Sequence, residues 1–313
     1  MKWKVMVSAP YMIPEIERFR SWFAEHDIEI DIPDVIERME ESDLLPIIGQ
    51  YDGVICGDDR FTEDVYKAAK KLKVISKWGT GIDSIHKEIA EKYGVTVCNT
   101  PDAFSHPVSD TVLGFMLSFS RTVIASDRLM KSGKWEKIPG KCLSEQTLGI
   151  IGCGNVGTRV AKKANAFGMK ILVYDIREIS KPVLEQYDIE QVDLDTLLKG
   201  SDFISTNCDL NDSSYHILSE AEFKKMKNTA VVINTARGPV IDEKALVKAL
   251  EQKEIAGCGL DVFEYEPLPV DSPLRKMENV ILSSHNSNSS PKYWGYVHDN
   301  TLNNLYKVLS QNN

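Results

Sequence analysis

Three side chains with the chemistry to bind a carboxylate and move a proton follow separate apolar runs late in the sequence. Arg237 follows the run Ala230–Ala236, and its planar guanidinium matches the two oxygens of a carboxylate. His285 closes the run Asn279–His285, where an imidazole could protonate a carbonyl oxygen near neutral pH. Glu266 lies in the loop after a third run, and a carboxylate beside the histidine would support that proton transfer.

Each of these residues also has a structural interpretation. Arg237 could form a surface salt bridge with Asp242 or Glu243. Glu264 competes with Glu266, and a lone histidine after a strand is usually capped or solvated. The shared position of the three residues favours chemistry, because their runs are predicted to be neighbouring strands of one parallel sheet. Ligands of open α/β sheets bind at the carboxyl ends of such strands.

A glycine pattern typical of dinucleotide binding precedes these residues. Gly152, Gly154 and Gly157 form GxGxxG between an apolar run and a predicted helix, and Asp175 ends the next apolar run. The glycines would let the backbone approach a pyrophosphate at the helix N-terminus, and the acid would bind ribose hydroxyls and repel a 2′-phosphate. An isolated GxGxxG is often only a tight turn, but the strand, helix, second strand and acid coincide here. The pattern predicts NAD rather than NADP.

The composition is that of an ordinary globular protein. The 313 residues carry a net charge of −9, with 42% hydrophobic and 27% charged side chains, which excludes collagen-like and disordered classes. The acidic balance argues against nucleic acid, and no run reaches the roughly 20 apolar residues of a membrane span. The beginning lacks a signal-peptide pattern, and the six cysteines form no CxxC pair. We expect a cytoplasmic protein without a metal site or disulfides.

Short apolar runs alternate with helical patterns along the chain, which predicts an α/β fold with two doubly wound parallel sheets. One long apolar helix is expected from Pro107 to Met130, and a last helix from Pro291 is expected to cross back to the first domain. The predicted domains are 1–100 plus 288–313 for substrate and 101–287 for NAD. The expected strands are Lys4–Ser8, Ile28–Ile32, Tyr51–Gly57, Leu72–Gly79, Val95–Thr100, Leu148–Gly154, Lys170–Asp175, Asp202–Asn207, Ala230–Ala236, Ala256–Val262 and Asn279–His285.

The motifs taken together resemble the D-2-hydroxyacid dehydrogenase family. GxGxxG with Asp175, NTARG with Arg237, GLDVFEYEP with Glu266 and SSH with His285 occur in the order and approximate spacing of that family. The earlier strings KWGTGIDSI and CNTPDAFSHPVSDTVLGFML extend the similarity over nearly the whole chain. The resemblance implies a NAD-dependent oxidoreductase for D-2-hydroxy acids and 2-oxo acids. It also implies a flavodoxin-like substrate domain and a Rossmann NAD domain with a cleft between them.

The resemblance also assigns residues. Arg237 would hold the 2-oxo acid, His285 would act as acid and base, and Glu266 would pair with the histidine. Family members are commonly homodimers joined through the NAD-binding domain. The substrate residues would be Lys77, Trp78, Gly79 and Thr80, with backbone amides around the last three holding the carboxylate. The NAD residues would be Gly152, Gly154, Asn155, Val156, Gly157, Asp175, Asn207, Cys208, Thr235, Ala236 and Asp261.

Within the family, the length and motifs are most similar to short D-3-phosphoglycerate dehydrogenases without a regulatory domain. Several departures leave the substrate open. The stretch around Cys56 reads VICGDDRFT, where phosphoglycerate enzymes often have an arginine near the position of Cys56. Lys77 stands where many members have arginine, and Asp102 replaces a frequent glycine. The resemblance thus implies 3-phosphoglycerate or a related small hydroxy acid as the expected substrate. Two other functions stay open, a regulatory protein that senses NAD(H) on the same scaffold and a phosphite- or formate-type dehydrogenase.

Overall fold

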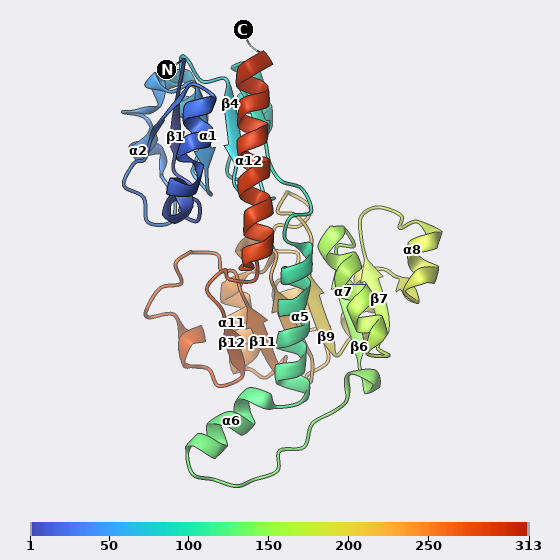
Figure 1. Ribbon diagram of the computed structural model, residues 1–313. Helices are drawn as coiled ribbons and strands as arrows, with labels where there is room; N and C mark the ends of the chain where they lie inside the picture. The colour runs from blue at the N-terminus through green and yellow to red at the C-terminus, as the bar shows by residue number, and fades with distance from the viewer. Residues whose placement is uncertain (1, 312–313) are drawn as a thin grey trace. The chain divides into compact units, whose positions relative to one another are not determined.

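The computed structural model describes residues 2–311, which divide into two compact α/β units (Figure 1). The first unit holds the described residues up to Phe104 and those from Ser290 onward, and the second is Ser105–Ser289. The observed boundaries between the units lie after residues 104 and 289. The sequence predicts them a few residues earlier, after residues 100 and 287.

The sheet of the first unit has five parallel strands in the order β2-β1-β3-β4-β5, which is the flavodoxin-like order. Every residue of β3 and β4 is buried, so both strands read as continuous apolar runs in the sequence. The strands are β1 (Trp3–Val7), β2 (Ile28–Asp31), β3 (Gly53–Cys56), β4 (Val74–Lys77) and β5 (Thr96–Cys98). The helices are η1 (Ile13–Phe19), α1 (Arg20–Glu25), α2 (Glu41–Leu44), η2 (Ile48–Gln50), α3 (Glu63–Ala68), α4 (Lys87–Lys92) and α12 (Pro291–Gln311).

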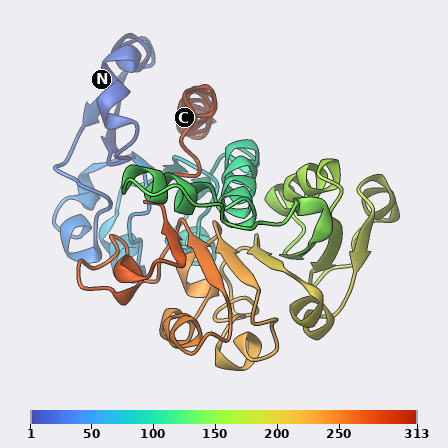
Figure 2. The same ribbon diagram turned by 90° about the horizontal axis from the view of Figure 1, so that it is seen from below.

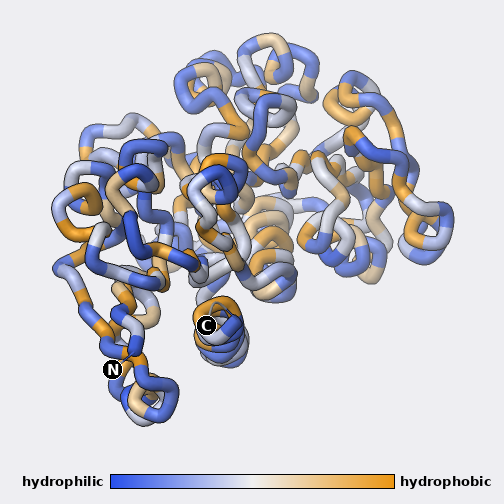
Figure 3. The backbone as a smooth tube through the Cα atoms, turned by 90° about the horizontal axis from the view of Figure 1, so that it is seen from above, coloured by the Kyte–Doolittle hydropathy of each residue, from blue (hydrophilic) through white to orange (hydrophobic). Residues whose placement is uncertain are grey.

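Helix α12 belongs to the first unit although it follows the second unit in the sequence (Figure 1). Leu305 is fully buried, and a Cβ placed on Gly53 of β3 would lie only 2.9 Å from its Cδ1. The hydroxyl of Ser76 donates to the carbonyl of Thr301 at 2.8 Å. Figure 3, which looks nearly along this helix beside the C label, shows both hydrophobic and hydrophilic residues in its turns. Its buried residues recur from Val297 to Leu309, as expected of a helix that covers a sheet on one side.

The sheet of the second unit has seven parallel strands in the order β12-β11-β10-β9-β6-β7-β8. The six from β8 to β11 follow the Rossmann order, in which the chain reverses direction across the sheet between β6 and β9. The strands are β6 (Thr147–Ile151), β7 (Lys170–Tyr174), β8 (Ile189–Gln191), β9 (Phe203–Thr206), β10 (Val231–Asn234), β11 (Gly257–Leu260) and β12 (Val280–Leu282). The helices are α5 (Ser105–Ser120), α6 (Val123–Lys131), η3 (Leu143–Glu145), α7 (Asn155–Ala166), α8 (Lys181–Gln186), α9 (Leu194–Gly200), α10 (Glu220–Phe223), η4 (Gly238–Val240), α11 (Glu243–Glu251) and η5 (Pro273–Lys276).

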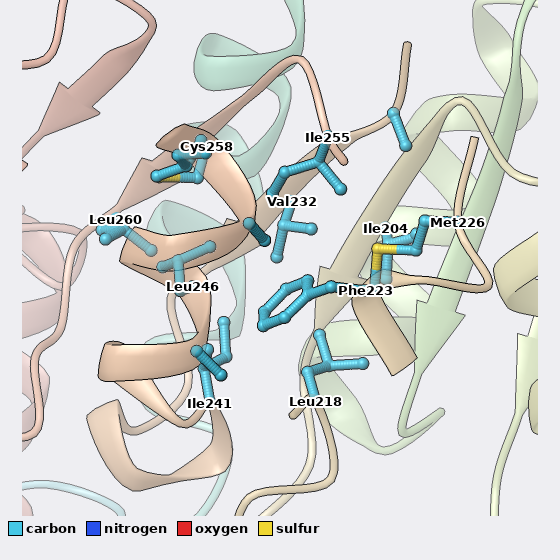
Figure 4. Close-up of a cluster of buried hydrophobic side chains, with 14 of the residues drawn as sticks. Ile204, Leu218, Phe223, Met226, Val232, Ile241, Leu246, Ile255, Cys258 and Leu260 are labelled. Carbon is cyan, nitrogen blue, oxygen red and sulfur yellow. The ribbon is translucent and has the colours of Figure 1, made fainter. Parts of the chain in front are cut away.

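Helices cover both faces of this sheet (Figure 2). On one face, Phe115 of α5 packs against Gly259 of β11, where an added Cβ would lie 2.8 Å from the ring. On the other face, Phe223 and Leu246 from α10 and α11 pack with Val232 of β10 (Figure 4). The sheet is therefore buried on both sides and forms a rigid base for the loops at its carboxyl edge.

The sequence gives no sign of strand β8. This three-residue edge strand pairs with β7, and only Ile189 of its residues is buried. A strand this short with one apolar residue lacks the run that reveals its neighbours.

The expectation of one helix from Pro107 to Met130 is wrong. Two helices, α5 and α6, meet at a bend of 59°, and Thr122 between them has a left-handed φ of 53°. No single helix in the described part of the chain is long and apolar enough to cross a bilayer, and only α5 and α6 counted together reach that length and composition. Helix α6 has no buried residue.

We expect Leu305→Ala to destabilise the first unit by about 2–5 kcal/mol, because it leaves a cavity between α12 and the sheet. Four of the five tryptophans lie in this unit, so denaturant unfolding followed by tryptophan fluorescence measures the change. Asn303→Ala, at an exposed position of the same helix, is the control. An equal loss in both variants would mean that burial against the sheet does not set the stability of this unit.

Candidate active site

Arg237, Glu266 and His285 follow three neighbouring strands of the second unit. Arg237 comes after β10, Glu266 after β11 and His285 after β12, and these strands lie side by side and parallel. Their carboxyl ends share one edge of the sheet, where ligands of open α/β sheets bind.

His285 and Glu266 form a direct pair. The Nδ1 of His285 lies 2.9 Å from the Oε2 of Glu266, and the two side chains are 27% and 24% exposed. A carboxylate can only accept, so Nδ1 carries the hydrogen and Nε2 is the atom for proton exchange with a substrate. The other oxygen of Glu266, Oε1, accepts from the amide of Phe263 at 3.0 Å and so fixes the carboxylate.

Buried Asp261 holds the turn that presents His285. Its side chain is 0% exposed and accepts from the amides of Asn286 and Ser287 at 2.8 and 3.0 Å, and from the Ser287 hydroxyl. The carbonyl of Asp261 accepts from the amide of His285 at 2.7 Å. These bonds keep His285 at a φ of 51°, a left-handed conformation that costs a residue other than glycine about 1–3 kcal/mol.

The turn that carries Arg237 is organised by Asn234, the last residue of β10. The Asn234 Oδ1 accepts from the Ala236 amide at 3.0 Å, and its Nδ2 donates to the Arg237 carbonyl at 2.9 Å. A Cβ on Gly238 would lie 1.9 Å from the carbonyl oxygen of Phe263, so only glycine allows this approach. The contact brings the Arg237 turn against the loop that carries Glu266.

A second histidine–carboxylate pair binds these two loops together. His216 Nε2 contacts Glu264 Oε1, and the His216 amide donates to the Pro239 carbonyl at 2.9 Å. Glu264, the alternative to Glu266 as the partner of His285, therefore pairs with His216, and Glu266 pairs with His285. Sequence reasoning misses both Asn234 and His216. The only available signal is the position of Asn234 at the end of an apolar run three residues before Arg237.

The glycines of GxGxxG form a cradle between β6 and α7. Gly152 has a φ of 89°, and a Cβ there would lie 2.7 Å from the amide nitrogen of Cys208. A Cβ on Gly157 would lie 2.1 Å from the carbonyl oxygen of Gly152. A Cβ on Gly154 would meet nothing within 4 Å, so the backbone at the start of α7 is open to a phosphate, with Asn155 and Val156 as the first helical residues.

Asp175 stands just beyond β7 with its carboxylate fixed by backbone amides. The Cys153 and Arg177 amides donate to its two oxygens at 2.8 and 2.9 Å. Burial opposes ionisation of Asp175, but these hydrogen bonds outweigh it and hold the pKa below its usual value. The group is therefore an ionised acceptor throughout the neutral range.

Two buried polar atoms at the same edge of the sheet lack a hydrogen-bond partner among the described residues. Within residues 2–311, the Oδ1 of Asn207 and the Oγ1 of Thr235 have no hydrogen-bond partner. Buried polar groups are normally paired, so a bound molecule with donors and acceptors would satisfy them. Together with the open cradle and the ionised Asp175, they fit a dinucleotide.

Other predicted residues are placed differently. Cys208 is half-buried beside Gly152, and burial raises the pKa of its thiol to about 11. Ala236 is half-buried in the turn before Arg237. The carboxylate of Asp261 accepts hydrogen bonds from the turn after His285, which is a structural role. Its place in the NAD site stays a prediction.

The predicted substrate residues lie in the first unit, at the carboxyl end of β4. Lys77 is buried and Gly79 has a φ of 126°. The Trp78 amide donates to the Cys56 carbonyl at 2.9 Å and is therefore already engaged, while the role of the amides around Trp78, Gly79 and Thr80 stays a prediction. The Thr80 hydroxyl donates to the Thr100 carbonyl at 2.9 Å. In the described part of the chain, no group of three or more His, Cys, Asp or Glu residues could hold a metal ion.

Comparisons with known proteins identify the family. Residues 113–287, more than half of the chain, match the D-isomer specific 2-hydroxyacid dehydrogenase, NAD binding domain. The chain belongs to this family. A hydroxypyruvate reductase of Thermotoga maritima is 42% identical over 255 residues, covering 80% of this chain and 82% of the relative. A D-3-phosphoglycerate dehydrogenase of Methanocaldococcus jannaschii is 38% identical over 260 residues, covering 82% of this chain and 48% of the relative.

A solved structure extends the similarity to both units. The crystal structure of D-lactate dehydrogenase from Aquifex aeolicus, complexed with NAD and lactic acid, has a TM-score of 0.87 at 25% identity. It covers 98% of this chain and 96% of that chain. The predicted family, the two parallel-sheet α/β domains and NAD as the cofactor are confirmed. The protein is a NAD-dependent oxidoreductase of D-2-hydroxy acids.

We expect Asp175→Ser to raise the dissociation constant of NADH about tenfold or more, because hydrogen bonds to a charged acceptor are lost. Discrimination against NADPH should fall as well, since the repelling charge is gone. Fluorescence titration with both nucleotides measures the two effects, and Glu185→Gln, at an exposed position of α8, is the control. An unchanged NADH affinity in Asp175→Ser would remove Asp175 from the site.

Proposed function

We propose that this protein reduces a small 2-oxo acid to the D-2-hydroxy acid with NADH, and that Arg237, Glu266 and His285 carry out the chemistry. The pairing of Glu266 with Nδ1 of His285 is the observation that carries the proposal. Nε2 would then be the imidazole nitrogen that exchanges a proton with the substrate, at the same sheet edge as the dinucleotide cradle. The Phe263 amide fixes the Glu266 carboxylate and so supports a fixed direction of the His285 imidazole.

The cofactor and the residues of the site divide the chemistry in this proposal. Bound NADH would supply the hydride for reduction, and NAD would accept it in the opposite direction. His285, protonated and paired with Glu266, gives the Nε2 proton to the carbonyl oxygen of the acid. Arg237 holds the carboxylate and stabilises the negative charge that develops on that oxygen. In the opposite direction neutral His285 takes the hydroxyl proton, so oxidation is favoured at higher pH.

The first unit would contribute to binding of the acid. We assign this role to Lys77 and to the amides of Gly79 and Thr80, whose place after β4 supports it. A screen of hydroxypyruvate, glyoxylate, pyruvate and 3-phosphohydroxypyruvate with NADH tests the proposed reaction. Steady oxidation of NADH is expected with at least one of them, and a protein that only senses NAD(H) would give none.

We expect His285→Ala to lower kcat for the best 2-oxo acid by about 100- to 10,000-fold, because positioned proton transfer typically contributes that much. NADH binding should persist, since the cradle of β6 and α7 is untouched. Stopped assays of NADH oxidation measure the loss, and fluorescence titration checks that the nucleotide still binds. His86→Ala, an exposed histidine in the first unit, is the matched control. Turnover within a few-fold of the wild type would refute the assignment.

We also infer that the protein is a homodimer joined through its second unit and that it works in the cytoplasm. Helix α6 stands apart from the sheet of its own unit (Figure 1) and has no buried residue. Val123, Met130 and Trp135 in and after this helix are 55%, 53% and 85% exposed. Such apolar exposure on a projecting segment supports a protein contact. The six free cysteines support a reducing compartment.

We expect light scattering to give twice the chain mass of 35.2 kDa for the wild type. Met130→Glu should shift the protein toward the monomer, because it places a charge in the apolar contact. Val270→Glu, at another exposed apolar position of the second unit, should leave the mass unchanged. A wild-type monomer at micromolar concentration would exclude the dimer.

A further inference from the structure

Lys77, the only cation among the residues assigned to the acid in the first unit, is paired with a carboxylate. Its ammonium lies 3.1 Å from Oδ1 of Asp58, and its side chain is 6% exposed. The same nitrogen donates to the Trp78 carbonyl at 3.3 Å. A buried ammonium paired in this way presents little net positive field to a ligand.

A second carboxylate stands beside the first. Asp59 is fully buried and accepts from the amide of Met39 at 2.9 Å and from the hydroxyl of Ser8. Burial raises the pKa of Asp59 to about 6, while these hydrogen bonds and the charge of Lys77 oppose the rise. At neutral pH Asp58 and Asp59 are therefore two carboxylates close to one ammonium. The loop Asp58–Arg60 itself carries two acids and one base, Arg60.

Aromatic rings complete the surroundings of this segment. Trp78 packs against Tyr11, Phe104 and Trp294, with ring centroids 5.4, 5.7 and 5.8 Å apart. The Trp78 indole donates to Nδ1 of His298 at 3.0 Å, so this polar atom is already engaged. Burial lowers the pKa of His298, which keeps the imidazole neutral and adds no positive charge.

We propose that Asp58, by pairing with Lys77, makes this protein select 2-oxo acids whose side group carries no negative charge. The inference rests on the proposed function, in which Lys77 and its neighbours contact the acid. A phosphate or second carboxylate near Lys77 would have to compete with Asp58 for the ammonium and would be repelled by Asp58 and Asp59. A small neutral side group, such as the hydroxymethyl of hydroxypyruvate, meets no such repulsion. Asp58 is thus a specificity-determining residue that acts against one class of substrate.

The test compares two acids that differ by one phosphate. The ratio of kcat/KM for 3-phosphohydroxypyruvate to that for hydroxypyruvate is measured at pH 7.5 with saturating NADH. The wild type is compared with Asp58→Asn and with the double variant that combines Asp58→Asn and Lys77→Met. Asp64→Asn, which removes an equally charged but exposed partner of Lys67 in the same unit, is the control.

We expect the wild type to prefer hydroxypyruvate and Asp58→Asn to raise the ratio about tenfold, mainly through a lower KM for the phosphorylated acid. The gain should shrink in 0.5 M salt and vanish in the double variant, and Asp64→Asn should show none. Wild-type preference for the phosphorylated acid, or an unchanged ratio in Asp58→Asn, would overturn the inference and leave the proposed function standing. A gain that persists without Lys77 would also overturn it, because another cation such as Arg60 would then bind the phosphate. Absence of turnover with every 2-oxo acid would overturn the proposed function itself.

Discussion

The arrangement of the active side chains depends on one buried carboxylate. Asp261 directly follows β11 and is fully buried, and its oxygens accept from backbone amides and a hydroxyl of the turn after β12. Taking a carboxylate out of water costs several kcal/mol unless such donors replace the water, so the turn has little freedom to rearrange. The same bonds impose the left-handed backbone of His285. Without Asp261, neither the direction of the imidazole nor its distance from Glu266 would be fixed.

Close backbone approaches extend this constraint to the rest of the edge. Gly152 and Gly238 each lie where a side chain would collide with the backbone of a neighbouring loop, at Cys208 and Phe263. Those two contacts place the dinucleotide cradle and the Arg237 turn on the same rigid sheet. Because the sheet is covered by helices on both faces, its carboxyl edge holds the dinucleotide cradle and the pair of Glu266 and His285, for which we propose proton transfer, in a fixed relation.

Much of this could be predicted from the sequence because it follows from local pattern. Buried parallel strands read as apolar runs, and the glycines, Asp175 and the residues that follow β10 and β12 stand at defined offsets from those runs. Strand β8 and the bend at Thr122 could not be predicted, since one has a single buried residue and the other is set by backbone conformation.

The side-chain pairings are the part that sequence reasoning cannot supply. His216 with Glu264, and Lys77 with Asp58, join residues from different loops whose distance is set only by the folded sheet. The hydrogen bond from the Trp78 amide to the Cys56 carbonyl is likewise set by the register of β3 and β4. In the proposed account these pairings decide which charges and donors remain for a substrate, and they would set specificity even where motifs already indicate the reaction class.

The central claim is that Glu266 acts through His285, and a double-mutant cycle tests it most directly. kcat for the best 2-oxo acid is measured for Glu266→Gln, His285→Ala and the combined variant, with NADH binding checked in each. If the carboxylate works only by orienting and charging the imidazole, Glu266→Gln lowers kcat in the wild type and changes nothing further once His285 is alanine. Independent, multiplicative losses from the two substitutions would contradict the account.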